Sequence, residues 1–258
     1  MTGRPTALVT GASAGIGREF ARQLAGRGHD LVLVARDEAR LDALGKELAE
    51  ANGCDAEVLA ADLTVAADLA RVEARAGAVD VLVNNAGFGT FGRFDTLDVD
   101  AETREVQLNV VALVRLTHAA AGPMAARGRG GIVNVSSLAG FQPGPMNATY
   151  SATKAFVTSF TQAVHEELKG TGVAVTALCP GFTHTEFQER AGAEASEVPG
   201  FMWQDPPEVV TAALDGLAKN RALVLPGAFN KVLGSASDMM PFAVSRRAAA
   251  AVLRRAAR

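Results

Sequence analysis

Short apolar runs alternate with longer amphipathic stretches along most of the chain. The runs are rich in β-branched residues and apolar at nearly every position, which predicts strands of a parallel sheet covered on both faces. They span residues 6–10, 30–35, 55–60, 79–83, 131–135, 173–178 and 222–225. Between them, apolar residues recur at helical spacing, which predicts helices near 15–28, 38–52, 65–76, 101–127, 149–169 and 207–219.

This strict succession of strand and helix indicates an α/β fold. Because parallel strands are joined by right-handed crossovers, it predicts a single doubly wound sheet with helices on both faces. No linker, repeat or change of composition divides the chain, so we expect one domain over 1–258. Two stretches interrupt the alternation, 84–100 and 180–206, and loops of this length in a compact fold are usually functional.

Composition and charge narrow the class of protein. The chain has 258 residues, of which 48% are hydrophobic, and a formal net charge of −3, which allows a full core and gives no basic field for nucleic acid. It has no apolar run of about 18 residues and no signal-peptide core, so we expect a cytoplasmic protein without a membrane span. Only two cysteines are present, with no CxxC pair or His/Cys cluster, so we expect a reducing compartment and no metal site.

Two glycine clusters compete as the phosphate-binding loop. Residues 87–92, GFGTFG, match the G-x-G-x-x-G dinucleotide fingerprint literally, but a polar stretch follows them before any predicted helix. Residues 10–17, TGASAGIG, follow a strand and open directly into a helix, whose free N–H groups face an anion. Gly11 suits the tight turn, Gly15 the approach of phosphates, and Gly17 close packing of helix on strand. We therefore predict phosphate binding at 10–17.

The glycine loop has a second interpretation. Gly11-Ala-Ser13-Ala-Gly15 also matches the G-x-S-x-G nucleophile elbow, which would make Ser13 the nucleophile of a hydrolase. Such an elbow needs an oxyanion loop from an earlier strand, and only ten residues precede Gly11. His184 is the one histidine in a suitable loop, and spacing identifies no acidic partner for it. Hydrolysis is therefore the weaker hypothesis.

The sequence YSATK opens a predicted helix and carries candidate proton-transfer chemistry. Tyr150 and Lys154 are four residues apart and share a helix face. A nearby ammonium favours the phenolate, so Lys154 should lower the tyrosine pKa from its ordinary value of about 10 and make the pair a general acid/base. Ser137 and the turn 84–87, NNAG, follow strands that end at the same sheet edge. Asn109 lies inside a predicted helix, where an amide is unfavourable unless it has a partner.

These motifs resemble the short-chain dehydrogenase/reductase family in order and spacing. The resemblance covers residues 6 to about 190 and rests on TGASAGIG, NNAG, Asn109, Ser137, YSATK and the segment from Pro180-Gly181 to Thr185. It implies a Rossmann-type sheet of about seven strands, an NAD or NADP cofactor, and interconversion of a ketone and a secondary alcohol. It also implies that Tyr150 donates a proton to a substrate oxygen that Ser137 polarises. Lys154 would bind the cofactor ribose and lower the tyrosine pKa, and Asn109 would hold a water of the proton relay.

The resemblance assigns further residues to the cofactor. The expected set is Gly11, Ser13, Ala14, Gly15, Ile16, Gly17, Arg36, Asp62, Leu63, Asn85, Ala86, Gly87, Tyr150, Lys154, Pro180, Gly181, Thr183 and Thr185. Ala35 stands where an NAD enzyme would carry an acid, and Arg36 can bind a 2′-phosphate as a bidentate fork, so we predict NADP(H), with NAD(H) as the second choice. Arg40 could add a second charge. Asp37 has the sequence position of a helix N-cap, and Asp62 matches the family's adenine-contacting aspartate or, alternatively, an N-cap.

Large apolar side chains gather in the loops expected around the site. They are Phe88, Phe91, Phe94, Phe141, Met146, Phe182, Phe187, Phe201, Met202 and Trp203. As a set they favour a hydrophobic carbonyl or alcohol, such as a lipophilic ketone or a 3-oxoacyl chain, over a sugar. Gly87 is both the last residue of NNAG and the first residue of GFGTFG. The rest of GFGTFG is therefore expected to shape the substrate side of the cleft.

The remaining stretches support weaker expectations. Residues 182–206 form a candidate lid, and a variable tail over 226–258 ends in a basic helix. The apolar positions of helices 101–127 and 149–169 fit the family's usual dimer-forming bundle, so we expect a homodimer or homotetramer. A nucleotide-sensing protein of the same fold is the competing hypothesis, although such a protein should have lost part of the Ser, Tyr and Lys set.

Overall fold

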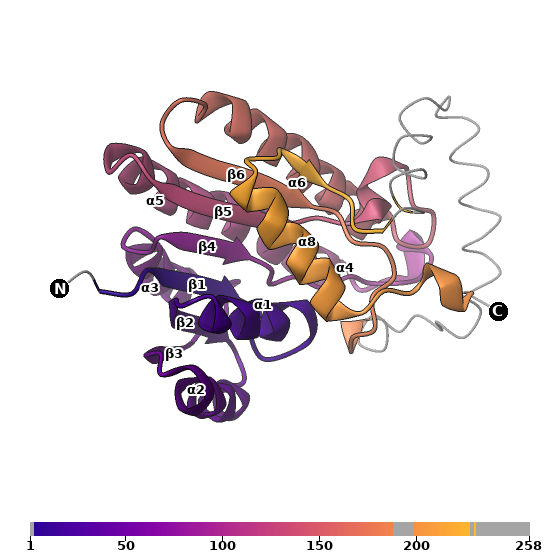
Figure 1. The fold of residues 1–258 in the computed structure, drawn as a ribbon. Coiled ribbons are helices and arrows are strands. Elements are labelled where there is room, and N and C mark those ends of the chain that lie inside the picture. The colour runs from indigo at the N-terminus through magenta and orange to yellow at the C-terminus, as the bar shows by residue number, and fades with distance from the viewer. Residues whose placement is uncertain (1–2, 188–198, 228–229, 231–258) are drawn as a thin grey trace.

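Seven parallel strands form one sheet in the order β3-β2-β1-β4-β5-β6-β7 (Figure 1). The structure is a computed structural model that describes residues 3–187, 199–227 and 230. The strands are β1 (Thr6–Thr10), β2 (Asp30–Ala35), β3 (Ala56–Ala60), β4 (Val81–Asn84), β5 (Gly130–Val135), β6 (Val173–Leu178) and β7 (Leu223–Val224). The strand order reverses between β1 and β4, which creates the crevice where doubly wound sheets bind ligands. The predicted fold class is confirmed.

Helices cover both faces of the sheet, as the fully apolar strands predict (Figure 1). One face packs against α1 (Gly15–Gly26), α2 (Glu38–Asn52) and α8 (Pro206–Ala218). The other packs against α3 (Ala66–Ala76), α5 (Leu113–Ala126) and α6 (Ala148–Glu167). The predicted helix over 101–127 begins earlier, as α4 (Val99–Val106), and passes through a π-helical turn at Gln107–Ala112 before α5.

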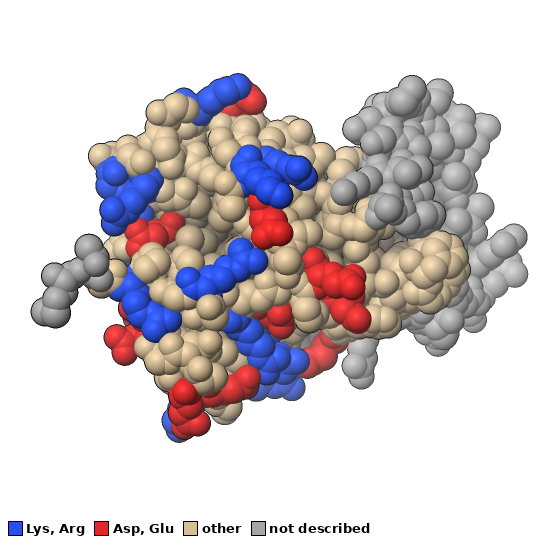
Figure 2. Space-filling model, in the orientation of Figure 1, with Lys and Arg blue, Asp and Glu red and all other residues tan. Residues whose placement is uncertain are grey.

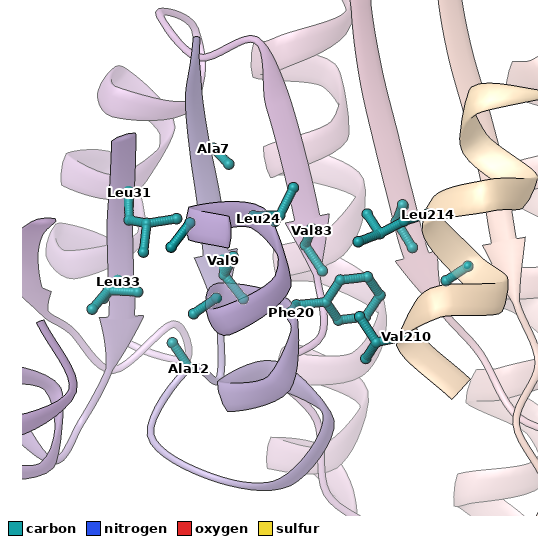
Figure 3. Packing of buried hydrophobic residues seen from close by; sticks show 14 of the residues in the cluster. Ala7, Val9, Ala12, Phe20, Leu24, Leu31, Leu33, Val83, Val210 and Leu214 are labelled. Atoms are coloured by element: carbon teal, nitrogen blue, oxygen red, sulfur yellow. The ribbon is translucent and has the colours of Figure 1, made fainter. Parts of the chain in front are cut away.

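The core consists of two apolar layers, one on each face. Successive strand residues point to opposite faces, so Leu8 joins the layer under α3 and α5 while Val9 joins the layer under α1 and α8. Figure 3 shows Phe20 of α1 between the sheet and Val210 and Leu214 of α8, and its side chain is fully buried. Burying such a side chain stabilises the fold by about 1.5–3 kcal/mol.

The surface carries acidic and basic side chains in mixture. Figure 2 shows both signs interspersed over the face of α1 and α8, without a continuous basic patch on that face. No helix among the described residues is long and apolar enough to cross a bilayer. Of the predicted lid, residues 188–198 lie outside the described residues, as does the predicted tail except for 226, 227 and 230.

Candidate active site

The turn after β4 is fastened to the end of β1, at the carboxyl edge of the sheet. The Thr10 hydroxyl oxygen accepts hydrogen bonds from the backbone N–H groups of Asn85 (2.9 Å) and Ala86 (3.0 Å). The Asn85 amide donates to the Thr10 carbonyl oxygen (2.9 Å) and to the Gly11 carbonyl oxygen (3.3 Å). NNAG therefore supports the glycine loop from the neighbouring strand.

The three glycines of the glycine loop, residues 10–17, stand at positions where a side chain would be strained or too close to its neighbours. Gly11 and Gly15 have φ angles of +66° and +52°, in the region that favours glycine. A Cβ on Gly17 would lie 2.2 Å from the Gly11 carbonyl oxygen. Helix α1 begins at Gly15 without a side-chain cap at Ala14, so its first N–H groups are available to an anion. This loop fits a dinucleotide pyrophosphate, whereas helix α4 begins only at Val99, well after GFGTFG.

The end of β2 carries the residues expected to read the 2′ position of the cofactor. The Arg36 side chain is exposed, and no hydrogen bond or ion pair among the described residues uses its guanidinium. Asp37 caps α2, as predicted, by accepting a hydrogen bond from the Arg40 backbone N–H (3.0 Å). The Arg40 guanidinium lies 3.2 Å from a carboxylate oxygen of Glu186. Of these two arginines, Arg40 forms ion pairs with Asp37 and Glu186, whereas the Arg36 guanidinium forms none among the described residues.

Asp62 lies in the turn after β3. It is not a helix N-cap, because α3 begins at Ala66 after Val65, so that alternative is wrong. Its Oδ1 accepts hydrogen bonds from the backbone N–H (2.9 Å) and the hydroxyl (2.7 Å) of Thr64. Burial opposes ionisation of this carboxyl, but the Thr64 hydrogen bonds and the nearby Arg36 charge hold its pKa below the ordinary value. Arg36 and Asp62 therefore lie at one end of the candidate cofactor site.

Ser137, Tyr150 and Lys154 meet between β5 and α6. The Ser137 hydroxyl lies close enough to the Tyr150 side chain to act on its pKa, and it accepts a hydrogen bond from the Ala139 backbone N–H (3.1 Å). The Lys154 side chain is buried, and its Nζ donates to the Val135 carbonyl oxygen (2.8 Å) and lies 5.6 Å from the centre of the Tyr150 ring. The structure therefore brings together the three residues that the sequence pattern singled out.

The protonation of Tyr150 and Lys154 differs from the expectation based on their spacing. Burial raises the pKa of Tyr150 above its ordinary value, and the Ser137 hydroxyl only partly offsets this effect. Burial also lowers the pKa of Lys154 to about 8. The expected lowering of the tyrosine pKa by Lys154 is thus wrong for this structure, because the cost of burying a phenolate dominates.

Asn109 has the partners that an amide inside a helix requires. From the π-helical turn, its Nδ2 donates to the Phe88 carbonyl oxygen (2.8 Å) and to the Thr153 hydroxyl (3.2 Å), and its Oδ1 accepts from the Phe88 N–H (3.1 Å). Turns of this kind widen a helix locally and are frequent at functional sites. The Asn109 side chain therefore joins the loop after β4 to α6, between Tyr150 and Lys154.

The loop 87–92, GFGTFG, forms a wall of the catalytic site. A Cβ on Gly87 would lie 2.9 Å from Asn109 Oδ1, and a Cβ on Gly89 would lie 2.9 Å from Cδ2 of Tyr150. Both glycines permit close approach to site residues rather than to phosphates. The role of Gly89 was not predicted, although the expectation that this segment shapes the substrate side agrees with its place.

The segment after β6 closes the other side of the site. The Leu138 backbone N–H donates to the Pro180 carbonyl oxygen (3.0 Å), and the Thr183 hydroxyl donates to the Gly181 carbonyl oxygen (3.1 Å). A Cβ on Gly15 would lie 3.0 Å from Cγ2 of Thr185, which places this segment against the glycine loop. Pro180 thus lies next to the turn that follows Ser137, and Thr185 lies next to the phosphate cradle.

Aromatic rings extend from this segment toward the tyrosine. The Phe187 ring lies 5.4 Å from the Tyr150 ring, and the His184 and Trp203 rings stack with centroids 4.6 Å apart. No hydrogen bond among the described residues joins Ser13 to His184, so the geometry gives the hydrolase alternative no support. Phe94 and Phe201 are 63% and 72% exposed, which places them outside the core.

Comparisons with known proteins agree with this geometry. The sequence profile described as short chain dehydrogenase matches residues 5–196. A very-long-chain 3-oxoacyl-CoA reductase of Anas platyrhynchos is 33% identical over 233 residues, which cover 86% of this chain and 72% of that protein. A short-chain dehydrogenase from Sphingobium yanoikuyae, solved in complex with NADPH, is 41% identical with a TM-score of 0.85, covering 91% of this chain and 92% of that chain. A bulky-bulky ketone specific alcohol dehydrogenase from Comamonas testosteroni is 38% identical with a TM-score of 0.79, covering 93% and 94%.

Proposed function

Because this chain belongs to the short-chain dehydrogenase/reductase family, we propose that it is an NADP(H)-dependent oxidoreductase that interconverts hydrophobic ketones and secondary alcohols. The observation that carries this proposal is the meeting of Ser137, Tyr150 and Lys154 beside an open glycine cradle at the carboxyl edge of the sheet. The proton donor (Tyr150), the hydroxyl that would bind the substrate oxygen (Ser137) and the cation (Lys154) would then lie on one side of the space that a substrate carbonyl enters.

In this proposal, NADP(H) is held by groups from several segments of the chain. The N–H groups at the start of α1 would face the pyrophosphate, Arg36 the 2′-phosphate, and Asp62 with Leu63 the adenine. Residues 85–87, Lys154 and the segment 180–185 would contact the riboses and the nicotinamide. The related dehydrogenase solved with NADPH supports this assignment. When bound, the cofactor supplies or accepts the hydride.

The site residues would manage the proton and the charge on the substrate oxygen. The Ser137 and Tyr150 hydroxyls would hydrogen-bond to that oxygen, and Tyr150 would give it a proton as negative charge develops. Lys154 would stabilise the resulting phenolate through its positive charge. Asn109 Oδ1 accepts one hydrogen bond from Phe88, so its second lone pair can hold a relay water.

The surroundings of Tyr150 favour a hydrophobic substrate. Phe187 packs on the tyrosine ring, and Phe182 and Trp203, whose ring centres are 5.7 Å apart, follow in the same region. The relatives act, by their names, on a very-long-chain 3-oxoacyl-CoA and on bulky-bulky ketones. Lipophilic ketones and 3-oxoacyl chains are therefore the substrate classes to examine first.

Apolar surface on two helices supports the proposed homodimer or homotetramer. Val99 and Val106 of α4 are 69% and 40% exposed, and Phe156 of α6 is 42% exposed. The Phe156 ring stacks on Phe160 at 5.8 Å, which extends the apolar strip along α6. Light scattering after gel filtration would test this, and a monomer at micromolar concentration would contradict it.

The decisive experiment measures the decrease in NADPH absorbance with a panel of ketones, for the wild-type protein and for Tyr150→Phe. We expect the wild type to reduce hydrophobic ketones, and the variant to lose nearly all turnover while binding NADPH with unchanged affinity. Labelling of Ser13 by a serine-hydrolase probe would favour the hydrolase alternative. A folded wild type that binds NADPH but turns over nothing in the panel would favour the nucleotide-sensing alternative.

A further inference from the structure

Two carboxyl groups are buried in α4, directly beneath loop 87–92. The Glu105 side chain is fully buried and Glu102 is 6% exposed. They lie three residues apart and therefore share a helix face. No Lys, Arg or His among the described residues forms an ion pair with either. Buried carboxylates are normally paired with cations, so this pair needs a different compensation.

That compensation comes from Thr90 of the loop and from the start of α6. The Thr90 backbone N–H donates to Glu105 Oε2 (3.0 Å), and its hydroxyl is within hydrogen-bond reach of both Glu105 Oε2 (3.1 Å) and Glu102 Oε1. The Thr149 hydroxyl donates to Glu102 Oε2. The Asn147 amide donates to the Thr90 carbonyl oxygen (2.5 Å). These bonds join the loop, α4 and the first turn of α6, one residue before the catalytic tyrosine.

The count of protons in this network decides its charge. A threonine hydroxyl has one proton and can donate to only one of two carboxylates. With both carboxylates ionised, the Thr90 hydroxyl would donate to only one of them, and its oxygen would face a carboxylate oxygen of the other with no proton between the two oxygens. If Glu105 carries a proton, it donates to the Thr90 hydroxyl, which in turn donates to Glu102. One extra proton therefore completes a continuous chain of hydrogen bonds.

We propose that Glu102 and Glu105 share one proton, and that the singly protonated pair positions loop 87–92 against Tyr150. In this loop Gly89 packs against the ring of Tyr150, so a movement of Thr90 would change the position of the proton donor. Glu102 and Glu105 are positioning residues in this scheme, because neither touches the reacting atoms. The kinetic consequence of the proposal rests on the proposed reductase activity, and its stability consequence does not.

The charged groups around Glu105 define the pH range. Burial is the main cause that raises the pKa of Glu105, to about 7, and the Glu102 charge on the same helix adds to it. The Thr90 hydrogen bonds and the Lys154 ammonium of α6 act in the opposite direction. A charge on Glu105 in turn raises the pKa of Tyr150, the other titratable group that faces it from α6. Near neutral pH, loss of the shared proton would weaken the loop contact and make Tyr150 a poorer acid.

The stability experiment compares wild type, Glu105→Gln and, as a control, Glu50→Gln, whose carboxylate is exposed on α2. The raised pKa of Glu105 contributes stability that is fully present below the ordinary value of 4.5 and is lost as the pH rises to about 7, whereas glutamine keeps a donor at all pH values. We expect the Tm of Glu105→Gln to equal that of wild type near about pH 4 and to exceed it by about 4 °C or more near about pH 8.5. The control should follow wild type throughout.

The kinetic experiment measures kcat and KM over the same pH range. We expect wild-type kcat for ketone reduction to fall with a midpoint near 7 that Glu105→Gln removes, with the KM for NADPH unchanged in both proteins. Thr90→Val and Thr90→Ser provide a second pair, since serine keeps the shared hydroxyl and valine removes it. We expect a kcat loss of about tenfold or more in Thr90→Val and recovery in Thr90→Ser.

A Tm difference between wild type and Glu105→Gln that does not change with pH overturns the proposal. Equal kcat values for Thr90→Val and Thr90→Ser also overturn it, and they serve as the deciding result if Glu105→Gln does not fold. The stability experiment needs no substrate, so its result can be interpreted even if the protein has no reductase activity. Conversely, if the protein is an active reductase but the Tm difference between wild type and Glu105→Gln does not change with pH, this inference fails and the proposed function stands.

Discussion

A buried pair of amides between β4 and β5 should contribute strongly to folding stability. Asn84 and Asn134 are 4% and 0% exposed, and Asn84 Nδ2 donates to Asn134 Oδ1 (2.9 Å) and to the Thr117 hydroxyl (3.0 Å). Asn134 Nδ2 donates to the Thr161 hydroxyl of α6 (3.0 Å). The pair thus joins two central strands to the helices α5 and α6 that lie behind them.

Replacing Asn134 by alanine has a cost that follows from these bonds. One N–H of Asn84 loses its acceptor in a site without solvent, and Thr161 loses a donor but keeps its own bond to the Val157 carbonyl oxygen. An unsatisfied buried donor and the small cavity together cost about 2–4 kcal/mol. For a domain of this size, the Tm should fall by about 5–15 °C.

The assay is a double-mutant cycle in urea, followed by circular dichroism. Wild type, Asn84→Ala, Asn134→Ala and the double variant give a coupling energy, which we expect to be about 1–2 kcal/mol because the two amides bond directly. Gln142→Ala serves as a control because its amide is exposed, and it should change stability by less than about 0.5 kcal/mol. Strictly additive losses, or an Asn134→Ala variant as stable as the control, would refute the reasoning.

Three further substitutions test the cofactor and substrate assignments. Arg36→Ala should raise the KM for NADPH by roughly 10- to 100-fold without changing that for NADH, because a charged contact to the 2′-phosphate is lost; equal changes for both cofactors would contradict it. Gly17→Ala should abolish NADPH binding in fluorescence titrations, since its Cβ would lie 2.2 Å from the Gly11 carbonyl oxygen, and retained binding would exclude the cradle. Phe187→Ala should lower kcat/KM for bulky ketones by about tenfold and leave small ketones unaffected, because the ring packs on Tyr150; a uniform loss would point to the tyrosine instead.

The fold was readable from the sequence because the strands are buried on both faces. An unbroken apolar run has few alternatives in an α/β chain, and all seven predicted strands match within two residues at either end. The seventh is shorter than expected, because β7 pairs with β6 only through Leu223 and Val224. Membership in the predicted family is confirmed as well, since its motifs lie at strand ends that the topology brings to one edge.

The contacts that organise the candidate site were not readable. Helical periodicity gives no sign of the π-helical turn, and the partner of Asn109 is a backbone group 21 residues away. The pKa of Tyr150 was predicted in the wrong direction because spacing reports the nearby lysine but not the depth of burial. The two glutamates of α4 share a face with Asn109, and that polar stripe at helical spacing was the available signal.

Loop 87–92 also limits how this protein can acquire new substrates. Gly87 and Gly89 have no room for a side chain next to Asn109 and Tyr150, so neither position is free to vary. Asn109 holds only the backbone of residue 88, so the identity of that side chain is not constrained by the hydrogen bonds. If the proposed function holds, Phe88 and Phe91 are the positions of this loop where mutation should alter substrate preference while the proton donor keeps its place. A mutant library for the proposed substrates should therefore be concentrated at these two phenylalanines, because the glycines beside them have no room for a side chain.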